Sequence, residues 1–137
     1  MLSIKHLSKV YAGKKRAVDN MNIDIEEGDF VAFIGTSGSG KTTALRMINR
    51  MIESTEGEIT INGKNIRQMN AVELRRSIGY VIQQIGLMPH MTVKDNIVLV
   101  PKLLKWSQEK KDQKAKELIR FCLLYTSPSP RDVEESR

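Results

Sequence analysis

Cysteine, aromatic residues and long apolar runs are all scarce in this chain of 137 residues. One cysteine, Cys122, cannot form an intrachain disulfide or the ligand cluster of a structural zinc site. Aromatic residues make up 5% of the chain, too few for the stacking platforms that bind single-stranded nucleic acid. The longest apolar run, Phe30–Ile34, is far shorter than the roughly 20 residues that cross a bilayer. Lys5 also interrupts any secretory signal. We therefore expect a cytoplasmic domain.

Positive charge is in moderate excess. Lys and Arg number 22 against 16 Asp and Glu, which gives a net charge of +6. This balance is compatible with nucleic acid, an anionic membrane surface or a polyphosphate ligand, and charge alone does not choose among them. The basic clusters at residues 14–16 and 110–111 are short. We interpret them as charged residues on solvent-exposed surfaces and expect no nucleic-acid partner.

The spacing of apolar residues predicts alternating strands and helices, which indicates an α/β fold. Residues 2–7 and 18–25 alternate as half-buried strands of one antiparallel sheet. The unbroken apolar run Phe30–Ile34 is typical of a central strand in a parallel sheet, and Ile78–Ile82 is a further strand candidate. A helix is predicted over residues 43–52, and Asn62-Gly63 predicts a hairpin turn after a strand that contains Ile59 and Ile61.

The later helices are predicted from their capping residues. Asn70 opens a short helix through Arg76, and Thr92 opens one over residues 93–100. Pro101 is expected to end that helix. Ser107 then caps a polar helix that runs to about Phe121.

A glycine-rich loop lies between the predicted buried strand and the predicted helix. It follows the phosphate-loop pattern of glycine, four residues, then Gly-Lys-Ser/Thr. Its residues are Gly35, Thr36, Ser37, Gly38, Ser39, Gly40, Lys41, Thr42 and Thr43. The glycines let successive N–H groups converge on phosphate oxygens, and the start of the helix adds unpaired donors and the positive end of its dipole. The sequence therefore predicts a site for nucleotide phosphates.

Three side chains at the end of this loop have distinct predicted roles. Lys41 reaches the β- and γ-phosphates, the Thr42 hydroxyl suits a Mg²⁺ ion that bridges them, and Thr43 donates to the α-phosphate. The expected cofactors are therefore ATP and Mg²⁺. A GTPase is disfavoured because neither the Asp-x-x-Gly segment nor the Asn-Lys-x-Asp guanine reader is found.

Beyond the loop, residues 1 to about 120 resemble the ATP-binding subunit of an ABC transporter. The resemblance implies a P-loop NTPase fold in which an N-terminal antiparallel sheet joins part of a parallel-sheet core. It assigns Tyr11 to stacking on adenine, with Val18 packed beside it. It also assigns Gln83, after the strand at residues 78–82, to contact with Mg²⁺ and the attacking water.

Within that family, residues 74–87 and 100–106 resemble importers of quaternary-amine osmoprotectants such as glycine betaine, carnitine or choline. The resemblance implies transmembrane permease subunits as partners, a second ATP-binding subunit in a dimer, and indirect dependence on a substrate-binding protein. The expected location is the cytoplasm, peripheral on the inner face of the plasma membrane.

The resemblance covers only the N-terminal half of such a domain. The signature motif, the Walker B strand with its Asp and Glu, and the switch histidine are not found. We therefore keep a second hypothesis, a truncated nucleotide-binding fragment without catalysis, because phosphoryl transfer needs a positioned water and stabilised charge. Residues 121–137 depart from the family and are expected to be a disordered, foreign tail. A basic nucleic-acid binder is the third hypothesis and the weakest.

Overall fold

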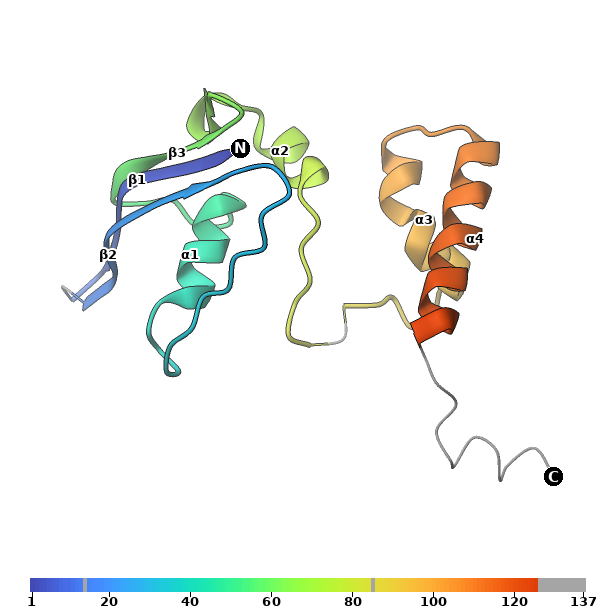
Figure 1. Ribbon diagram of the computed structural model, residues 1–137, viewed down its shortest axis with the longest axis horizontal. Helices are drawn as coiled ribbons and strands as arrows, with labels where there is room; N and C mark the ends of the chain where they lie inside the picture. The colour runs from blue at the N-terminus through green and yellow to red at the C-terminus, as the bar shows by residue number, and fades with distance from the viewer. Residues whose placement is uncertain (14, 85, 126–137) are drawn as a thin grey trace, which may run out of the picture. The chain divides into compact units, whose positions relative to one another are not determined.

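The computed structural model describes residues 1–13, 15–84 and 86–125. These residues form two compact units, one from Met1 to Tyr80 and one that begins at Val81. Figure 1 shows the chain coloured from its N-terminus to its C-terminus. Among the described residues, the strands belong to the first unit, and the regular structure of the second is helical.

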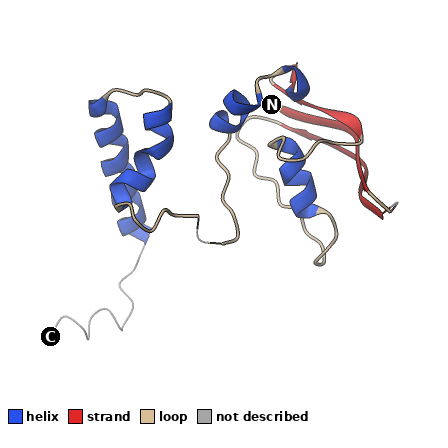
Figure 2. Ribbon diagram, turned by 180° about the vertical axis from the view of Figure 1, so that it is seen from behind, coloured by secondary structure: helices blue, strands red, loops and turns tan. Residues whose placement is uncertain are grey.

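A four-stranded antiparallel sheet forms the framework of the first unit (Figure 2). Its strands are β1 (Leu2–Tyr11), β2 (Lys15–Ile25), β3 (Glu56–Ile61) and β4 (Lys64–Asn65). The order across the sheet is β2-β1-β3-β4, so β1 has a partner on each side. This confirms the predicted antiparallel sheet near the N-terminus.

The predicted hairpin turn joins β3 to β4. Asn62 and Gly63 both have positive φ angles, 49° and 78°, which is the backbone that a two-residue type I′ turn requires. The turn places Ile61 opposite Lys64 in the register of the two strands.

Helix α1 (Lys41–Ile48) packs its buried face against one side of the sheet (Figure 2). Met47 of α1 joins an apolar core with residues of the sheet and of the segment that follows it. The core residues are Ile4, Leu7, Met47, Ile59, Ile66 and Leu74, each no more than 3% exposed. Burial of these side chains is the main term that holds α1 on the sheet.

After the sheet, a 3₁₀ turn η1 (Ile66–Gln68) and the short helix α2 (Ala71–Ser77) cover one end of the core. The Asn70 side chain accepts hydrogen bonds from the backbone N–H groups of Val72 and Glu73, at 2.9 and 3.2 Å. Asn70 is therefore the N-cap that the sequence predicts.

Two predicted strands are absent from the structure. Residues 30–34 and 78–82 have no strand pairing with any described residue, so the predictions of a central strand at Phe30–Ile34 and of a strand at Ile78–Ile82 were wrong here. Phe30 is 96% exposed and Ile34 is 95% exposed. A strand needs a neighbour for its N–H and C=O groups, and within the described residues neither segment has one.

The second unit contains two helices, α3 (Val93–Leu103) and α4 (Gln108–Tyr125). Thr92 caps α3 as predicted, because its side chain accepts from the N–H of Asp95 at 3.1 Å. Pro101 does not end α3, which was predicted to stop at residue 100; proline removes one N–H donor, but the Leu104 N–H still bonds to the Val100 carbonyl at 2.9 Å.

The C-terminal ends of two other helices, α1 and α4, also differ from the predictions. Helix α1 stops at Ile48 rather than at residue 52, because Arg50 adopts a left-handed backbone with φ of 52°. Helix α4 continues past Phe121 to Tyr125, so the first residues of the predicted disordered tail are helical. The rest of that tail, residues 126–137, lies outside the described residues. No described helix is long and apolar enough to cross a membrane.

Candidate phosphate-binding site

The glycine-rich loop occupies residues 35–40 and leads directly into α1, as the sequence predicts. Gly40 is the N-cap residue of α1, and its φ of 93° lies in the left-handed region. The Gly40 carbonyl accepts from the Ala44 N–H at 2.9 Å, which is the first bond of the helix. Glycine adopts this backbone with the least strain.

The lack of space around Gly40, as well as its backbone conformation, restricts this position to glycine. A Cβ atom placed there would lie 2.1 Å from the Ala17 carbonyl oxygen of β2 and 3.3 Å from Cγ2 of Val18. The loop therefore packs directly on the second strand of the sheet. This contact brings Val18, which the resemblance assigns to the nucleotide site, beside the end of the phosphate loop.

Lys41 folds back over the loop that precedes it. Its ammonium group donates to the carbonyl oxygens of Gly35 and Thr36, at 2.7 and 2.8 Å, and to the Ser39 hydroxyl at 3.0 Å. Three bonds in different directions hold the charge in the curve of the loop. An anion that enters this curve meets a positioned cation.

The first turn of α1 adds backbone donors at the same place. No side chain of a described residue caps these N–H groups, and the positive end of the helix dipole lies there. Thr42 is exposed and Thr43 is half-buried in this turn. Uncapped amides, a fixed ammonium and a close-packed glycine fit a phosphate chain, and the neighbouring hydroxyl of Thr42 is a ligand type that Mg²⁺ accepts.

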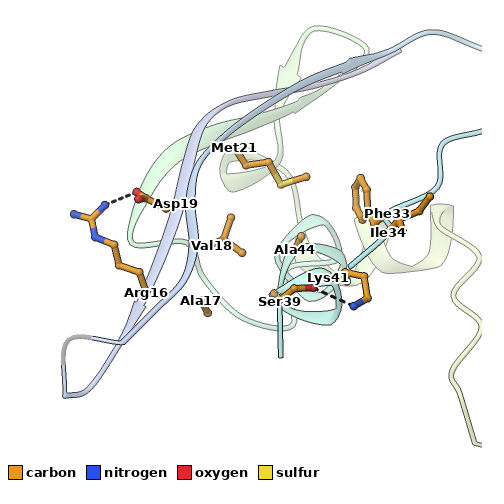
Figure 3. Close-up of a pocket in the computed structure, with 11 residues that line it drawn as sticks. Arg16, Ala17, Val18, Asp19, Met21, Phe33, Ile34, Ser39, Lys41 and Ala44 are labelled. Carbon is orange, nitrogen blue, oxygen red and sulfur yellow. Dashed lines mark hydrogen bonds and ion pairs between the residues drawn. The ribbon is translucent and has the colours of Figure 1, made fainter. Parts of the chain in front are cut away.

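A pocket of about 420 Å³ opens between this loop and β2 (Figure 3). In this view Val18 of β2 lies on one side of the pocket and Phe33 and Ile34 on the other, with Ala44 of α1 between them, while Lys41 and Ser39 meet at its edge. The volume falls within the range of ordinary small-molecule sites. The lining residues are Arg16, Ala17, Val18, Asp19, Met21, Phe33, Ile34, Ser39, Gly40, Lys41 and Ala44.

Tyr11 and Gln83 do not line this pocket. Tyr11 ends β1, is 43% exposed, and has the Lys9 ammonium 5.3 Å from its ring centre. Gln83 belongs to the second unit. Adenine stacking by Tyr11 and metal contact by Gln83 stay predictions.

Several residues of the pocket were not among those predicted from the sequence. Met21 extends the apolar side formed by Val18, although the two residues are three positions apart, because the register of β2 against β1 shifts between them. Strict strand alternation would place them on opposite faces, so it is not a signal for Met21. Arg16, interpreted as part of a solvated basic cluster, forms an ion pair with Asp19. Figure 3 draws this pair across β2 from Lys41.

Comparison with known families decides what kind of domain carries this loop. The family described as ABC transporter matches residues 18–129, which is most of the chain. The chain belongs to the ABC transporter family. The match includes the phosphate loop and α1, and it confirms the family that the sequence resembles.

Curated relatives in this family include ATP-binding proteins of osmoprotectant transport. The chain is 63% identical over 121 residues to the carnitine transport ATP-binding protein OpuCA of Listeria monocytogenes, covering 88% of this chain and 30% of that protein. It is 58% identical to the glycine betaine/carnitine/choline transport ATP-binding protein OpuCA of Bacillus subtilis, covering 88% and 32%. The chain thus spans about a third of the length of these relatives.

Solved structures of ATP-binding cassettes share the fold. A dimeric post-hydrolysis state of the cassette MJ0796 bound to ADP and Pi matches with a TM-score of 0.73 and 34% identity, over 88% of this chain and 56% of that one. A second dimeric structure of MJ0796, a bacterial ABC transporter cassette, gives 0.74 and 36% over the same shares. The fold is that of an ABC-type nucleotide-binding domain, of which the chain forms a part.

Proposed function

We propose that this chain is the N-terminal part of an ATP-binding subunit that powers an ABC importer of quaternary-amine osmoprotectants. The observation that carries the proposal is the loop at residues 35–40, in which the Lys41 ammonium is held by three bonds at the uncapped start of α1. This arrangement suits a nucleotide triphosphate. The transport activities named for the relatives support the cargo class.

MgATP is the proposed ligand, and the residues present fit it. The backbone N–H groups of the loop and of the first turn of α1 would hold the phosphates, with Lys41 as the cation and Thr42 as a metal ligand. Val18 and Met21 offer an apolar wall to the remainder of the nucleotide, and Tyr11 is the proposed platform for the base. Bound ATP would supply the phosphoanhydride bond whose hydrolysis drives transport.

Turnover requires more than these residues. A water must be positioned and the developing charge must be stabilised, and Gln83 is the candidate in this chain for contact with the metal and the water. We propose that the chain pairs with a second ATP-binding subunit on the cytoplasmic side of the membrane and that both bind transmembrane permease subunits. A substrate-binding protein then delivers the cargo. The dimeric cassette structures support the pairing of two such domains.

An assay of phosphate release from MgATP tests whether the subunit hydrolyses ATP. The purified chain, alone and together with permease subunits of an osmoprotectant importer, is assayed beside Lys41→Ala and the exposed control Lys5→Ala. We expect Lys41→Ala to abolish nucleotide binding and any turnover, and Lys5→Ala to leave both unchanged. Binding without turnover in every assembly would favour the non-catalytic fragment over the ATPase subunit.

The cargo class is tested in the reconstituted assembly. Glycine betaine, carnitine and choline are added in turn with the substrate-binding protein, and glutamine serves as the unrelated solute. Turnover that rises with the quaternary amines alone supports the proposal. Turnover that responds to glutamine, or to none of the amines, contradicts it.

A further inference from the structure

The C-terminal end of α1 has an arginine where helices usually place glycine. The Met51 N–H bonds to the Arg46 carbonyl at 2.9 Å and the Arg50 N–H bonds to the Met47 carbonyl at 3.0 Å. This is the pattern of a Schellman motif, in which the residue after the cap takes a left-handed backbone. That residue is Arg50, with φ of 52°.

The Arg50 side chain forms hydrogen bonds with the segment that follows the sheet. Its guanidinium donates to the carbonyls of Ile66 and Met69, at 3.1 and 2.9 Å, and pairs with the Glu53 carboxylate at 3.3 Å. Only 19% of the side chain is exposed. Arg50 thereby ties the end of α1 to η1 and to the residue just before the Asn70 cap of α2.

Arg75 makes the reverse connection from α2. Its Nε donates to the Asn49 carbonyl at 3.2 Å, and its Nη2 donates to the Arg50 carbonyl at 2.5 Å. Both acceptors lie at the C-terminal end of α1, where backbone carbonyls lack helical partners and a cation is favourable. We call Arg50 and Arg75 together the arginine clasp.

The clasp and the phosphate loop are at opposite ends of the same short helix. Helix α1 has eight residues, a length of about 12 Å at 1.5 Å per residue. Lys41 begins it and the clasp holds its other end. If α1 shifted along its axis when the loop bound phosphate, the hydrogen bonds of Arg50 and Arg75 at its other end would change length.

We propose that the arginine clasp couples occupation of the phosphate loop to helix α2, with Arg50 and Arg75 as positioning residues for the nucleotide site. This inference rests on the proposed function. Met47 of α1 and Leu74 of α2 belong to the same apolar core, so the two helices share buried surface in addition to the hydrogen bonds of the clasp. Glycine would form the same turn without strain, and the arginine at position 50 therefore indicates a role for its side chain.

Hydrogen exchange of the full chain, with and without MgATP, tests the coupling. Arg50→Gly removes the Arg50 side chain and suits the left-handed backbone. Arg75→Ala removes the other side chain of the clasp, and Arg75→Lys keeps the positive charge but replaces the forked guanidinium by one ammonium group. Arg76→Ala is the matched control, because Arg76 is the adjacent exposed arginine of α2. Circular dichroism reports whether each variant is folded.

In the wild type and in Arg76→Ala, we expect MgATP to slow exchange of the amides at residues 71–77. We expect Arg50→Gly and Arg75→Ala to lose this effect and to bind MgATP about fivefold to tenfold more weakly, in the lower part of the usual range for coupled sites. Arg75→Lys should recover part of it. A merely structural tie would lower the melting temperature and leave the MgATP effect intact.

The clasp is overturned if Arg50→Gly and Arg75→Lys keep both the wild-type affinity and the MgATP-dependent protection of α2. These two variants decide the question even if Arg75→Ala does not fold. Failure of the proposed function gives a different result, in which the wild type binds no MgATP or Lys41→Ala binds as well as the wild type. Binding that is lost in Lys41→Ala but unchanged in the clasp variants refutes the clasp alone.

Discussion

Strand β1 and the segment Phe30–Ile34 are both rich in apolar residues, yet only β1 is a strand. β1 pairs with β2 on one side and β3 on the other, and its residues Ile4 and Leu7 are 1% and 0% exposed. Phe30 and Ile34 are almost fully exposed. The two segments show that apolar composition gives a tendency to form a strand, and that a partner strand decides the outcome.

One partner of β1, β2, is close by in the chain, and the other, β3, begins only at Glu56. β2 follows it through a short turn, and β3 pairs with it in an antiparallel register that sets Leu2 opposite Ile61. A parallel strand at residues 30–34 would need a crossover connection and a parallel neighbour. No described residue supplies that neighbour.

Truncation of apolar side chains gives the largest effect that this comparison predicts. Leu7→Ala should lower the free energy of unfolding by about 2–5 kcal/mol, because it leaves a cavity in the core. Ile34→Ala should change it by no more than about 0.5 kcal/mol, because Ile34 is exposed. Urea denaturation of both variants measures the difference. Equal losses would show that residues 30–34 are packed as tightly as β1.

Two glycines of the phosphate loop extend the comparison to the site. Gly40 and Gly38 both have positive φ, 93° and 81°, but only Gly40 lies against another segment. Gly40→Ala should cost about 3 kcal/mol and displace the loop, since strain and a clash with Ala17 act together. Gly38→Ala should cost about 1 kcal/mol from strain alone. Thermal melts give the stabilities, and comparable losses would contradict the contact with β2.

Removal of a helix cap gives a smaller effect. Asn70→Ala should cost about 1 kcal/mol, because two N–H groups of α2 lose their acceptor. Asn70→Asp keeps an acceptor at the same place and serves as the matched control. Amide exchange of α2 measures the fraying, and an unchanged rate in Asn70→Ala would show that α2 does not depend on its cap.

The second unit provides the smallest expected effect, a pH dependence at an exposed ion pair. Lys94 Nζ lies 2.7 Å from Asp112 Oδ1 and joins α3 to α4. Its hydrogen bond lowers the pKa of Asp112 below the ordinary 3.8. The pair's stabilisation is therefore present above pH 3.8 and is lost as the pH falls through the lower pKa of the folded state.

Carboxyl chemical shifts of Asp112 measure this titration directly. Lys94→Met should raise the midpoint towards the ordinary aspartate pKa, whereas Lys114→Met removes a different pair, with Glu117, and should not. The same midpoint in Lys94→Met and in the wild type would show that the pair does not form in solution. Salt should weaken the effect, because both groups are exposed.

Local chemistry made much of the fold predictable from the sequence. Asn62-Gly63 requires two positive φ angles, and Asn70 and Thr92 offer acceptors to the first turn of a helix; each of these signals acts over a few residues. The wrong predictions depend on distant or cumulative terms. Residues 30–34 and 78–82 need partner strands. Pro101 removes one backbone N–H donor from α3, but the other hydrogen bonds of the helix are enough to continue it past this residue.

In the site, too, the local feature was predicted from the sequence and the long-range feature was not. The spacing of Gly35, Gly40 and Lys41 encodes the curve of the phosphate loop, so the pattern alone found it. The clasp of Arg50 and Arg75 was missed, because it joins residues 25 positions apart and because an arginine at a glycine position leaves no pattern in the sequence. Such contacts depend on how η1 and α2 fold back on the end of α1.

Calorimetric titration of the folded chain with MgATP tests the central claim most directly, since that claim is that the loop and the Lys41 ammonium bind a triphosphate. The account predicts saturable binding of one MgATP per chain, lost in Lys41→Ala and retained in Lys5→Ala. Absence of binding heat at several temperatures in a sample whose sheet is intact by circular dichroism, or equal binding by Lys41→Ala, would contradict it.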